Sequence, residues 1–264
     1  MPLPESKRVL YKHNPLAEVI CQLQFSPILE IGVQDPVAFQ NKVRGMYPEY
    51  QREDAIGHLP RGVAELLGQI RVPRIEPAEA VTHKFALSDF TRFISLSGSF
   101  VAVTEQRYRR WEQFRREVEL AKTAVEEVYN PVRYVRIGLR YQNLIDPSKL
   151  GLPGESWDRL VNPALAGILG SAVVQDDVQE AMSNALLAVS EVQGGFVRLR
   201  HGLVRTGPTQ SRAYLIDADF FTQEMGAIDH GNDVLDSFNR LAGNLFRWAI
   251  TPRLQSALAP GDID

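Results

Sequence analysis

A long amphipathic helix that runs directly into a strand, within residues 108–141, is the feature that most constrains this chain. Apolar residues recur there at spacings of three and four, which is the pattern of one buried helix face. They are Tyr108, Trp111, Phe114, Val118, Ala121, Val125 and Val128. Asn130 and Pro131 predict the end of this helix, because proline disfavours helical geometry in the residue before it. Such a helix must fold back over a sheet to bury its apolar face.

The segment that follows, residues 132–141, alternates in the period of a half-buried strand. Similar patterns predict strands over residues 16–25, 63–75, 80–90, 196–205 and 211–221, and a strand or hairpin over 93–103. Helices are predicted from Pro36 to Tyr47, over residues 157–169, and from Val234 to Trp248. Residues 178–192 fit a helix or a strand, and we interpret their second part as a strand.

These elements predict an α+β fold in which mostly antiparallel sheets are covered by long amphipathic helices. Asp146-Pro147 and the run Gly151–Gly154 indicate a boundary between an N-terminal half, residues 1–146, and a C-terminal half, residues 147–264. Both halves contain the sequence Arg-x-Gly-Leu, from Arg136 and from Arg200, so they can be two related split-βαβ-like units packed together. A glycine within a strand indicates a bulge or a close backbone approach.

Composition excludes several classes of protein. The net charge of -3 gives no global attraction for polyanions, so any contact with nucleic acid needs a local basic patch. The single cysteine, Cys21, excludes an internal disulfide and multi-cysteine zinc sites, and it is predicted to be buried. No apolar run approaches the length of a membrane span, and the first residues lack the apolar core of a signal peptide. We therefore expect a cytoplasmic protein without a membrane contact.

Catalytic and metal-binding motifs are missing from the sequence. Its five histidines show no metal-ligand spacing, and no nucleophile elbow or phosphate-binding glycine loop occurs. His201 is predicted to be a hydrogen-bonded core residue. Asp217 and Asp219 point to the same side of a strand and could hold a divalent cation, but they also fit the solvent face of an edge strand. No catalytic residue, no cofactor and no metal site is predicted, with these two aspartates as the weak alternative for a metal.

Arginines form the remaining pattern with chemical meaning. Several crowd the first turns of the long helix, where the helix dipole disfavours cations by roughly 0.3–1 kcal/mol each: Arg107, Arg109, Arg110, Arg115 and Arg116. The strands add a second set, Arg136, Arg140, Arg198 and Arg200, with Tyr134 among them. Arginines interleaved with aromatic residues can bind phosphates and stack on bases, so this second set is a candidate ligand-binding site. The alternative is a set of internal arginine–carboxylate pairs.

The chain resembles a sporadically distributed bacterial family of unknown function, and the resemblance spans nearly its whole length. It is carried by Asn-Pro-Leu-x-Glu-Val-Ile-Cys-Gln-Leu from Asn14 and Arg-Ile-Gly-Leu-Arg-Tyr from Arg136, with further matches at 108–114 and 246–254. Members of that family tend to have a histidine near the position of Asn239 or Arg240, which this chain lacks. Such a distribution is common for mobile genes, so the resemblance implies a toxin–antitoxin or phage-defence type of locus.

The missing catalytic motifs and the apolar closing helix, with Phe246 and Trp248, predict a non-catalytic interaction or accessory protein. We expect it to bind a protein partner or to associate with itself. The first alternative is a protein that binds nucleic acid or nucleotides through its arginine-rich strand face. The second alternative is a metal-dependent hydrolase that uses Asp217 and Asp219.

Overall fold

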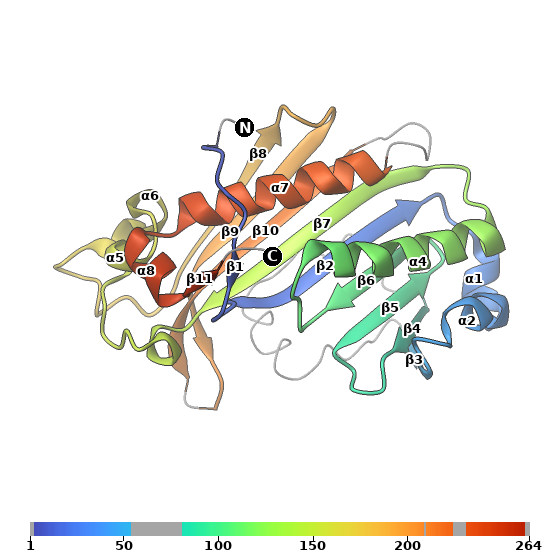
Figure 1. Cartoon of the computed structure of the whole chain (residues 1–264), viewed down its shortest axis with the longest axis horizontal. Coiled ribbons are helices and arrows are strands. Elements are labelled where there is room, and N and C mark those ends of the chain that lie inside the picture. Colours follow the sequence, from blue (N-terminus) through green and yellow to red (C-terminus); the bar gives the residue numbers. More distant parts are fainter. Residues whose placement is uncertain (1–2, 54–80, 209, 224–230, 262–264) are drawn as a thin grey trace. The chain divides into compact units, whose positions relative to one another are not determined.

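The computed structural model describes residues 3–53, 81–208, 210–223 and 231–261 (Figure 1). Its main sheet has nine strands in the order β3-β4-β5-β6-β2-β7-β10-β9-β8, and β1 pairs with β11 in a small second sheet. The fold is α+β with a large antiparallel sheet and helices, which confirms the predicted fold class. That the two halves of the sequence are related stays a prediction, and the predicted strand over residues 63–75 lies outside the described residues.

The elements have the following bounds. The strands are β1 (Leu10–Tyr11), β2 (Leu16–Phe25), β3 (Glu49–Glu53), β4 (Thr82–Ala86), β5 (Arg92–Ser97), β6 (Phe100–Glu105), β7 (Tyr134–Ile145), β8 (Ala181–Val189), β9 (Gly195–Thr206), β10 (Ser211–Thr222) and β11 (Pro260–Gly261). The α-helices are α1 (Leu29–Val33), α2 (Val37–Val43), α4 (Trp111–Tyr129), α5 (Trp157–Leu160), α6 (Pro163–Ala166), α7 (Gly231–Ala249) and α8 (Pro252–Ala257). Two 3-10 helices are η1 (Pro147–Leu150) and η2 (Gly167–Gly170).

The chain folds into two compact units, and each is discontinuous in sequence. The α4 unit consists of Glu18–Leu139 and Phe221–Leu235. The β8 unit consists of Met1–Ala17, Arg140–Phe220 and Asp236–Asp264. The predicted boundary between residues 146 and 147 stays a prediction.

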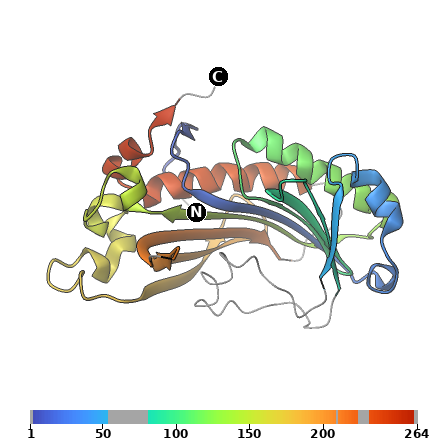
Figure 2. The same ribbon diagram turned by 90° about the horizontal axis from the view of Figure 1, so that it is seen from below.

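In the α4 unit, the long helix covers one face of the antiparallel strands (Figure 2). The helix buries five of the residues whose spacing predicted it, Trp111, Phe114, Val118, Ala121 and Val125, whereas Val128 is half-buried and Tyr108 precedes the helix. It ends where Asn130 adopts a left-handed conformation with φ 43° before Pro131. The predicted segment 93–103 is a hairpin of β5 and β6, in which Ser97 pairs with Phe100. Tyr47 and Tyr134 are buried and donate hydrogen bonds to Glu117 and Glu126 of α4, which connects the helix to the surrounding elements.

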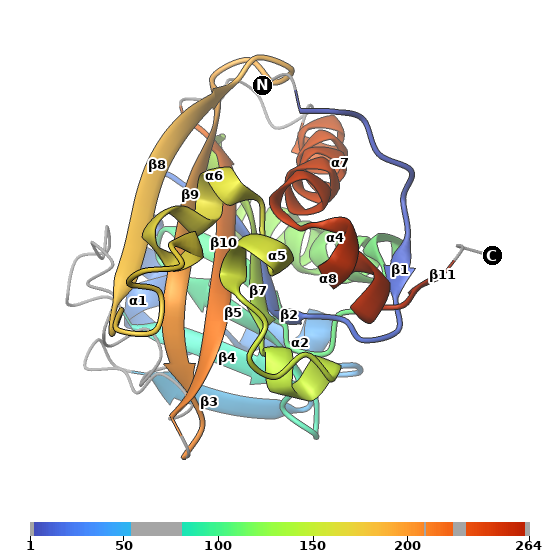
Figure 3. The same cartoon turned by 90° about the vertical axis from the view of Figure 1, so that its left-hand side faces the viewer.

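In the β8 unit, β8, β9 and β10 lie side by side, with β8 outermost (Figure 3). Helix α7 packs on this unit through Phe238, whose ring lies 5.8 Å from that of Phe220, and through Asn239, which accepts a hydrogen bond from Tyr141. The predicted strands over 196–205 and 211–221 are confirmed as β9 and β10. The second part of the ambiguous segment 178–192 is the strand β8.

The predicted single helix over residues 157–169 is wrong, because the chain breaks there into α5, α6 and η2. Val161 is extended, with φ -115° and ψ 158°, and forms a β-bridge with Ile250. The side chain of Asn162 then accepts a hydrogen bond from the backbone N–H of Ala164 and caps a new helix with Pro163 in its first turn. Proline cannot donate the backbone hydrogen bond that a continuous helix requires, so the apolar spacing alone misled the prediction.

Of the two strand glycines of the Arg-x-Gly-Leu segments, Gly202 lies at a close backbone approach, as predicted, whereas Gly138 meets only a side chain. A Cβ on Gly138 would lie 2.3 Å from Nη1 of Arg136, so the glycine leaves room for a flexible side chain. A Cβ on Gly202, which has φ +152°, would lie 1.9 Å from the backbone oxygen of Ala181 in β8. The pairing of β9 with β8 therefore requires glycine at position 202.

Gly202→Ala should lower the free energy of unfolding by about 3 kcal/mol, because the new methyl group collides with backbone and the φ angle is strained. Gly243→Ala is the matched control, since a Cβ there meets nothing within 4 Å and alanine favours a helix. It should raise stability by up to about 1 kcal/mol. Urea denaturation of both variants checks this expectation, and equal stability of the two would contradict it.

Candidate functional site

Two of the predicted ligand-binding arginines, Arg140 and Arg200, lie against one buried carboxylate in the β8 unit. Nε and Nη2 of Arg140 each donate to an oxygen of Asp217 at 2.7 Å. Nε of Arg200 lies 3.2 Å from Oδ2 of the same residue. The side chain of Asp217 is 1% exposed, against 18% for Arg140 and 8% for Arg200. The two guanidinium groups therefore neutralise a carboxylate inside the fold.

Burial lowers the pKa of Arg200, because desolvation disfavours the charged guanidinium. The negative charge of Asp217 raises this pKa, and the positive charge of Arg140 lowers it. The group stays charged because the ordinary pKa of arginine is so high. Two positive charges with one carboxylate between them form a structural ion cluster, whose loss leaves buried charge without compensation. Internal arginine–carboxylate pairing was the predicted alternative to a ligand site for these residues.

The other members of the predicted site have different partners, although the charge of Arg198 also helps to lower the pKa of Arg200. Nη1 of Arg136 donates to Oε1 of Gln22 at 3.2 Å, and its guanidinium lies 4.8 Å from the ring centre of Phe221. Tyr134 is buried, and burial with the neighbouring Glu126 raises the pKa of its hydroxyl. Arg198 is half-buried on β9, opposite Leu186 of β8. Whether these residues bind a ligand stays a prediction.

The two aspartates of the metal alternative differ in their surroundings. The interpretation of their strand as a solvated edge is wrong, because β10 lies between β7 and β9 and Asp217 is buried. Each oxygen of Asp217 faces a guanidinium group, which would repel a cation placed beside it. Asp219 is half-buried. Among the described residues, no group of three or more His, Cys, Asp or Glu side chains is placed to hold a metal ion.

His201 is a hydrogen-bonded core residue, as predicted. The hydroxyl of Tyr214 donates to the backbone oxygen of Leu165 at 2.8 Å, so its single proton is used. Nδ1 of His201, 2.8 Å from that hydroxyl, must therefore be the donor. Cys21 is also buried as predicted, and burial raises the pKa of its thiol to about 12, which removes it as a nucleophile.

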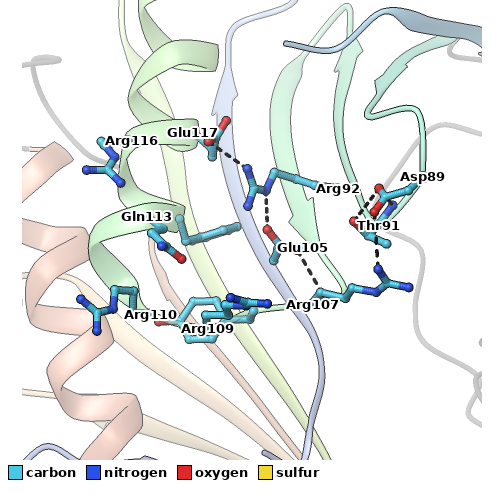
Figure 4. Close-up of a pocket in the computed structure, with 12 residues that line it drawn as sticks. Asp89, Thr91, Arg92, Glu105, Arg107, Arg109, Arg110, Gln113, Arg116 and Glu117 are labelled. Carbon is cyan, nitrogen blue, oxygen red and sulfur yellow. Dashed lines mark hydrogen bonds and ion pairs between the residues drawn. The ribbon is translucent and has the colours of Figure 1, made fainter. Parts of the chain in front are cut away.

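A pocket of about 460 Å³ opens in the α4 unit where β6 leads into the long helix (Figure 4). Five arginines and three acidic residues line it, so its walls carry an excess of two positive charges. The arginines are Arg92, Arg107, Arg109, Arg110 and Arg116. Four of them belong to the basic run at the start of the long helix, which is not among the predicted site residues. The unfavourable placement of cations at a helix N-terminus was the signal that could have identified it.

An ion-pair network forms one part of this pocket. Arg92 and Glu105 are directly opposite each other on β5 and β6, and Nε of Arg92 donates to Glu105. Nη1 of Arg92 lies 2.8 Å from Oε1 of Glu117, whose other oxygen accepts from the hydroxyl of Tyr47 at 2.6 Å. Burial alone would lower the pKa of Arg92, but the two carboxylates outweigh it and raise that pKa. Both carboxylates are thus held by the fold itself.

The remaining charged groups of the pocket divide into two sets. Arg107 lies 3.5 Å from Asp89, whose pKa is lowered by hydrogen bonds from Thr91. Arg109 and Arg116 are exposed and Arg110 is half-buried, and none of the three forms an ion pair with a residue that the structure describes. Figure 4 shows Arg110 and Arg116 on the helix side of the pocket and Arg107 with Asp89 on the other.

The start of α4 adds to the positive potential of the pocket. Its N-cap residue, Arg110, makes no side-chain hydrogen bond to the first turn. Helix N-termini attract anions through their dipole and their backbone N–H groups, and guanidinium groups bind phosphate or carboxylate in a bidentate manner. Tyr108 lines the same pocket with its ring 5.9 Å from that of Phe114. The arrangement is chemically suited to an anion that carries more than one negative charge.

No family model matches the chain, and no curated protein matches it in sequence. The implied type of locus therefore stays a prediction. In the described part of the chain, no helix is long and apolar enough to cross a membrane.

Asp217→Asn should lower the free energy of unfolding by about 3–5 kcal/mol, because Arg140 and Arg200 then lie beside a neutral amide and only the weaker attraction of Asp219 acts on Arg200. The control is Lys42→Gln, which removes an ion pair to Glu127 whose partners are 51% and 52% exposed. Lys42→Gln should lower the free energy of unfolding by less than about 1 kcal/mol. Chemical denaturation compares the two variants, and a cost below about 1 kcal/mol for Asp217→Asn would count against a buried ion cluster.

The imidazole of His201 should titrate below its usual pKa of 6.5, because burial disfavours the charged ring. Its contribution to stability is present above the unfolded-state pKa and is lost as the pH falls towards the folded-state value. Titration of its ring C–H resonance by NMR checks this direction. A midpoint above 6.5 would contradict the assignment of a neutral, desolvated ring.

Proposed function

We propose that this protein is a non-catalytic binding protein that recognises a phosphate-bearing ligand through the pocket at the start of α4. The observation that carries the proposal is the placement of Arg109, Arg110 and Arg116 around one pocket, with no ion pair to a described residue. Solvated arginines at such a position are unfavourable for the helix, and an anionic ligand reverses that effect.

The charge pattern supports phosphate more than a single carboxylate. The pocket has an excess of two positive charges before the helix dipole is counted, and phosphate groups carry up to two negative charges each. Arginine also offers a rigid fork of N–H donors that matches phosphate oxygens. Tyr108 beside these arginines provides a ring on which a base can stack.

The absence of catalysis is part of the proposal. Glu105 and Glu117 are the carboxylates of the ion-pair network in the pocket, and both form an ion pair with Arg92. Carboxylates held in this way are poor general bases, because a neighbouring guanidinium stabilises their charged form. The pocket therefore favours holding a charged group over transferring a proton.

The cellular role is proposed from the resemblance. A phosphate-binding accessory protein fits a mobile or defence-type locus, where it would sense a nucleotide or nucleic acid for a partner. Copurification with the product of the neighbouring gene tests this role separately from ligand binding.

Binding of ATP to the full chain should depend on the pocket arginines. Arg109→Gln/Arg116→Gln should raise the dissociation constant at least about tenfold, because each arginine contributes a charge-assisted hydrogen bond. Isothermal titration calorimetry at two salt concentrations measures this, and affinity should fall at the higher salt. The matched control is Arg44→Gln/Arg133→Gln, which removes the same charge from exposed positions outside the pocket.

Titrations with inorganic pyrophosphate and with a single-stranded DNA of about 15 nucleotides distinguish the ligand classes. Equal effects of the pocket and control variants would show that the pocket is not the site. Turnover of ATP during the titration, followed by chromatography, would contradict the non-catalytic part of the proposal.

A further inference from the structure

The β8 unit carries an edge strand with little protection against pairing. Strand β8 is last in the sheet order and pairs with β9 on one side only. Among the described residues, nothing pairs with its other side. In an antiparallel strand, every second residue directs its backbone N–H and C=O towards such a free edge, so the edge is a template for another strand.

Strand β8 differs in composition from β3, the strand at the opposite edge of the sheet. Residues 181–189 include no charged residue and no proline, which are the usual devices against edge-to-edge pairing. The opposite terminal strand, β3, is shorter and carries Glu49, Arg52 and Glu53. The side chains of Leu186 and Leu187 are 48% and 36% exposed on opposite faces of β8.

We propose that β8 pairs antiparallel with β8 of a second copy of this chain, about a two-fold axis at Ala185. The strand is self-complementary in this register. Leu186 lies opposite Asn184 of the second copy, and Leu187 lies opposite Ser183, so each exposed leucine covers a small polar residue. No like charges meet along the nine residues, and the paired region is about 30 Å long.

The ends of β8 also fit this pairing. Ser190 and Glu191 lie in the turn between β8 and β9, in which the N–H of Val192 donates to the backbone oxygen of Val189 at 3.3 Å, so pairing ends at Val189. A two-fold axis at Ala185 places Ala181 opposite Val189 of the second copy, so all nine residues of the strand are paired. A strand without charged residues meets no like charge when it pairs with itself, which favours a second copy over a charged strand.

Sedimentation equilibrium of the full chain tests the proposal. The wild-type mass should approach twice 29.6 kDa as the concentration rises. Ala185→Lys places two lysines directly opposite each other and should raise the dimer dissociation constant at least about tenfold. Gln51→Lys on β3 is the matched control, since it adds the same charge at an exposed edge-strand position, and it should not change the mass.

Charge complementation tests the register. Ala185→Glu alone should be a monomer, and its mixture with Ala185→Lys should restore the dimer because opposite charges then face each other. If a charged variant fails to fold, Ala185→Cys replaces it, because opposite residues lie within disulfide distance and oxidation should give a covalent dimer. A wild-type monomer, a dimer unaffected by Ala185→Lys, or no covalent dimer from Ala185→Cys would overturn the proposal.

Discussion

Carboxylates determine which arginines of this chain are held inside the fold and which stay at the surface. Asp217 forms ion pairs with Arg140 and Arg200 in the β8 unit. Glu105 and Glu117 form ion pairs with Arg92 in the α4 unit. A buried guanidinium without such a partner would be too costly for a fold of ordinary stability. The arginines at the start of α4 that form no ion pair with a described residue line the pocket, and ligand binding there is our proposal.

The same division explains why a basic pocket exists in a chain with a net charge of -3. Most acidic residues near α4 are engaged along the helix, as in the pairs of Arg115 with Glu119 and Lys122 with Glu126. In both pairs the carboxylate lies four positions after its basic partner, so these carboxylates lie beyond the first turn of the helix. A local positive potential therefore coexists with an acidic chain, and such a potential acts only within roughly 8 Å at physiological salt.

Much of the fold could be predicted from periodicity, and most of the ion pairs could not. The spacing of Trp111, Phe114 and Val118 gave α4 correctly, because one apolar face must be buried whatever it packs against. The partners Arg140 and Asp217 are 77 positions apart, and no local pattern indicates that β7 and β10 bring them together. The ion pair of Arg92 and Glu105 could have been predicted from the sequence. A hairpin in which Ser97 pairs with Phe100 places these two residues directly opposite each other.

The most direct test of the account is where a bound anion lies. Solution NMR of the full chain, titrated with ATP and observed at the arginine Nε–H groups, reports each guanidinium separately. The account predicts saturable shifts at Arg109, Arg110 and Arg116, with Arg140 and Arg200 unchanged. Shifts at Arg140 and Arg200 without shifts at the start of α4, or no saturable shift at any arginine, would contradict it.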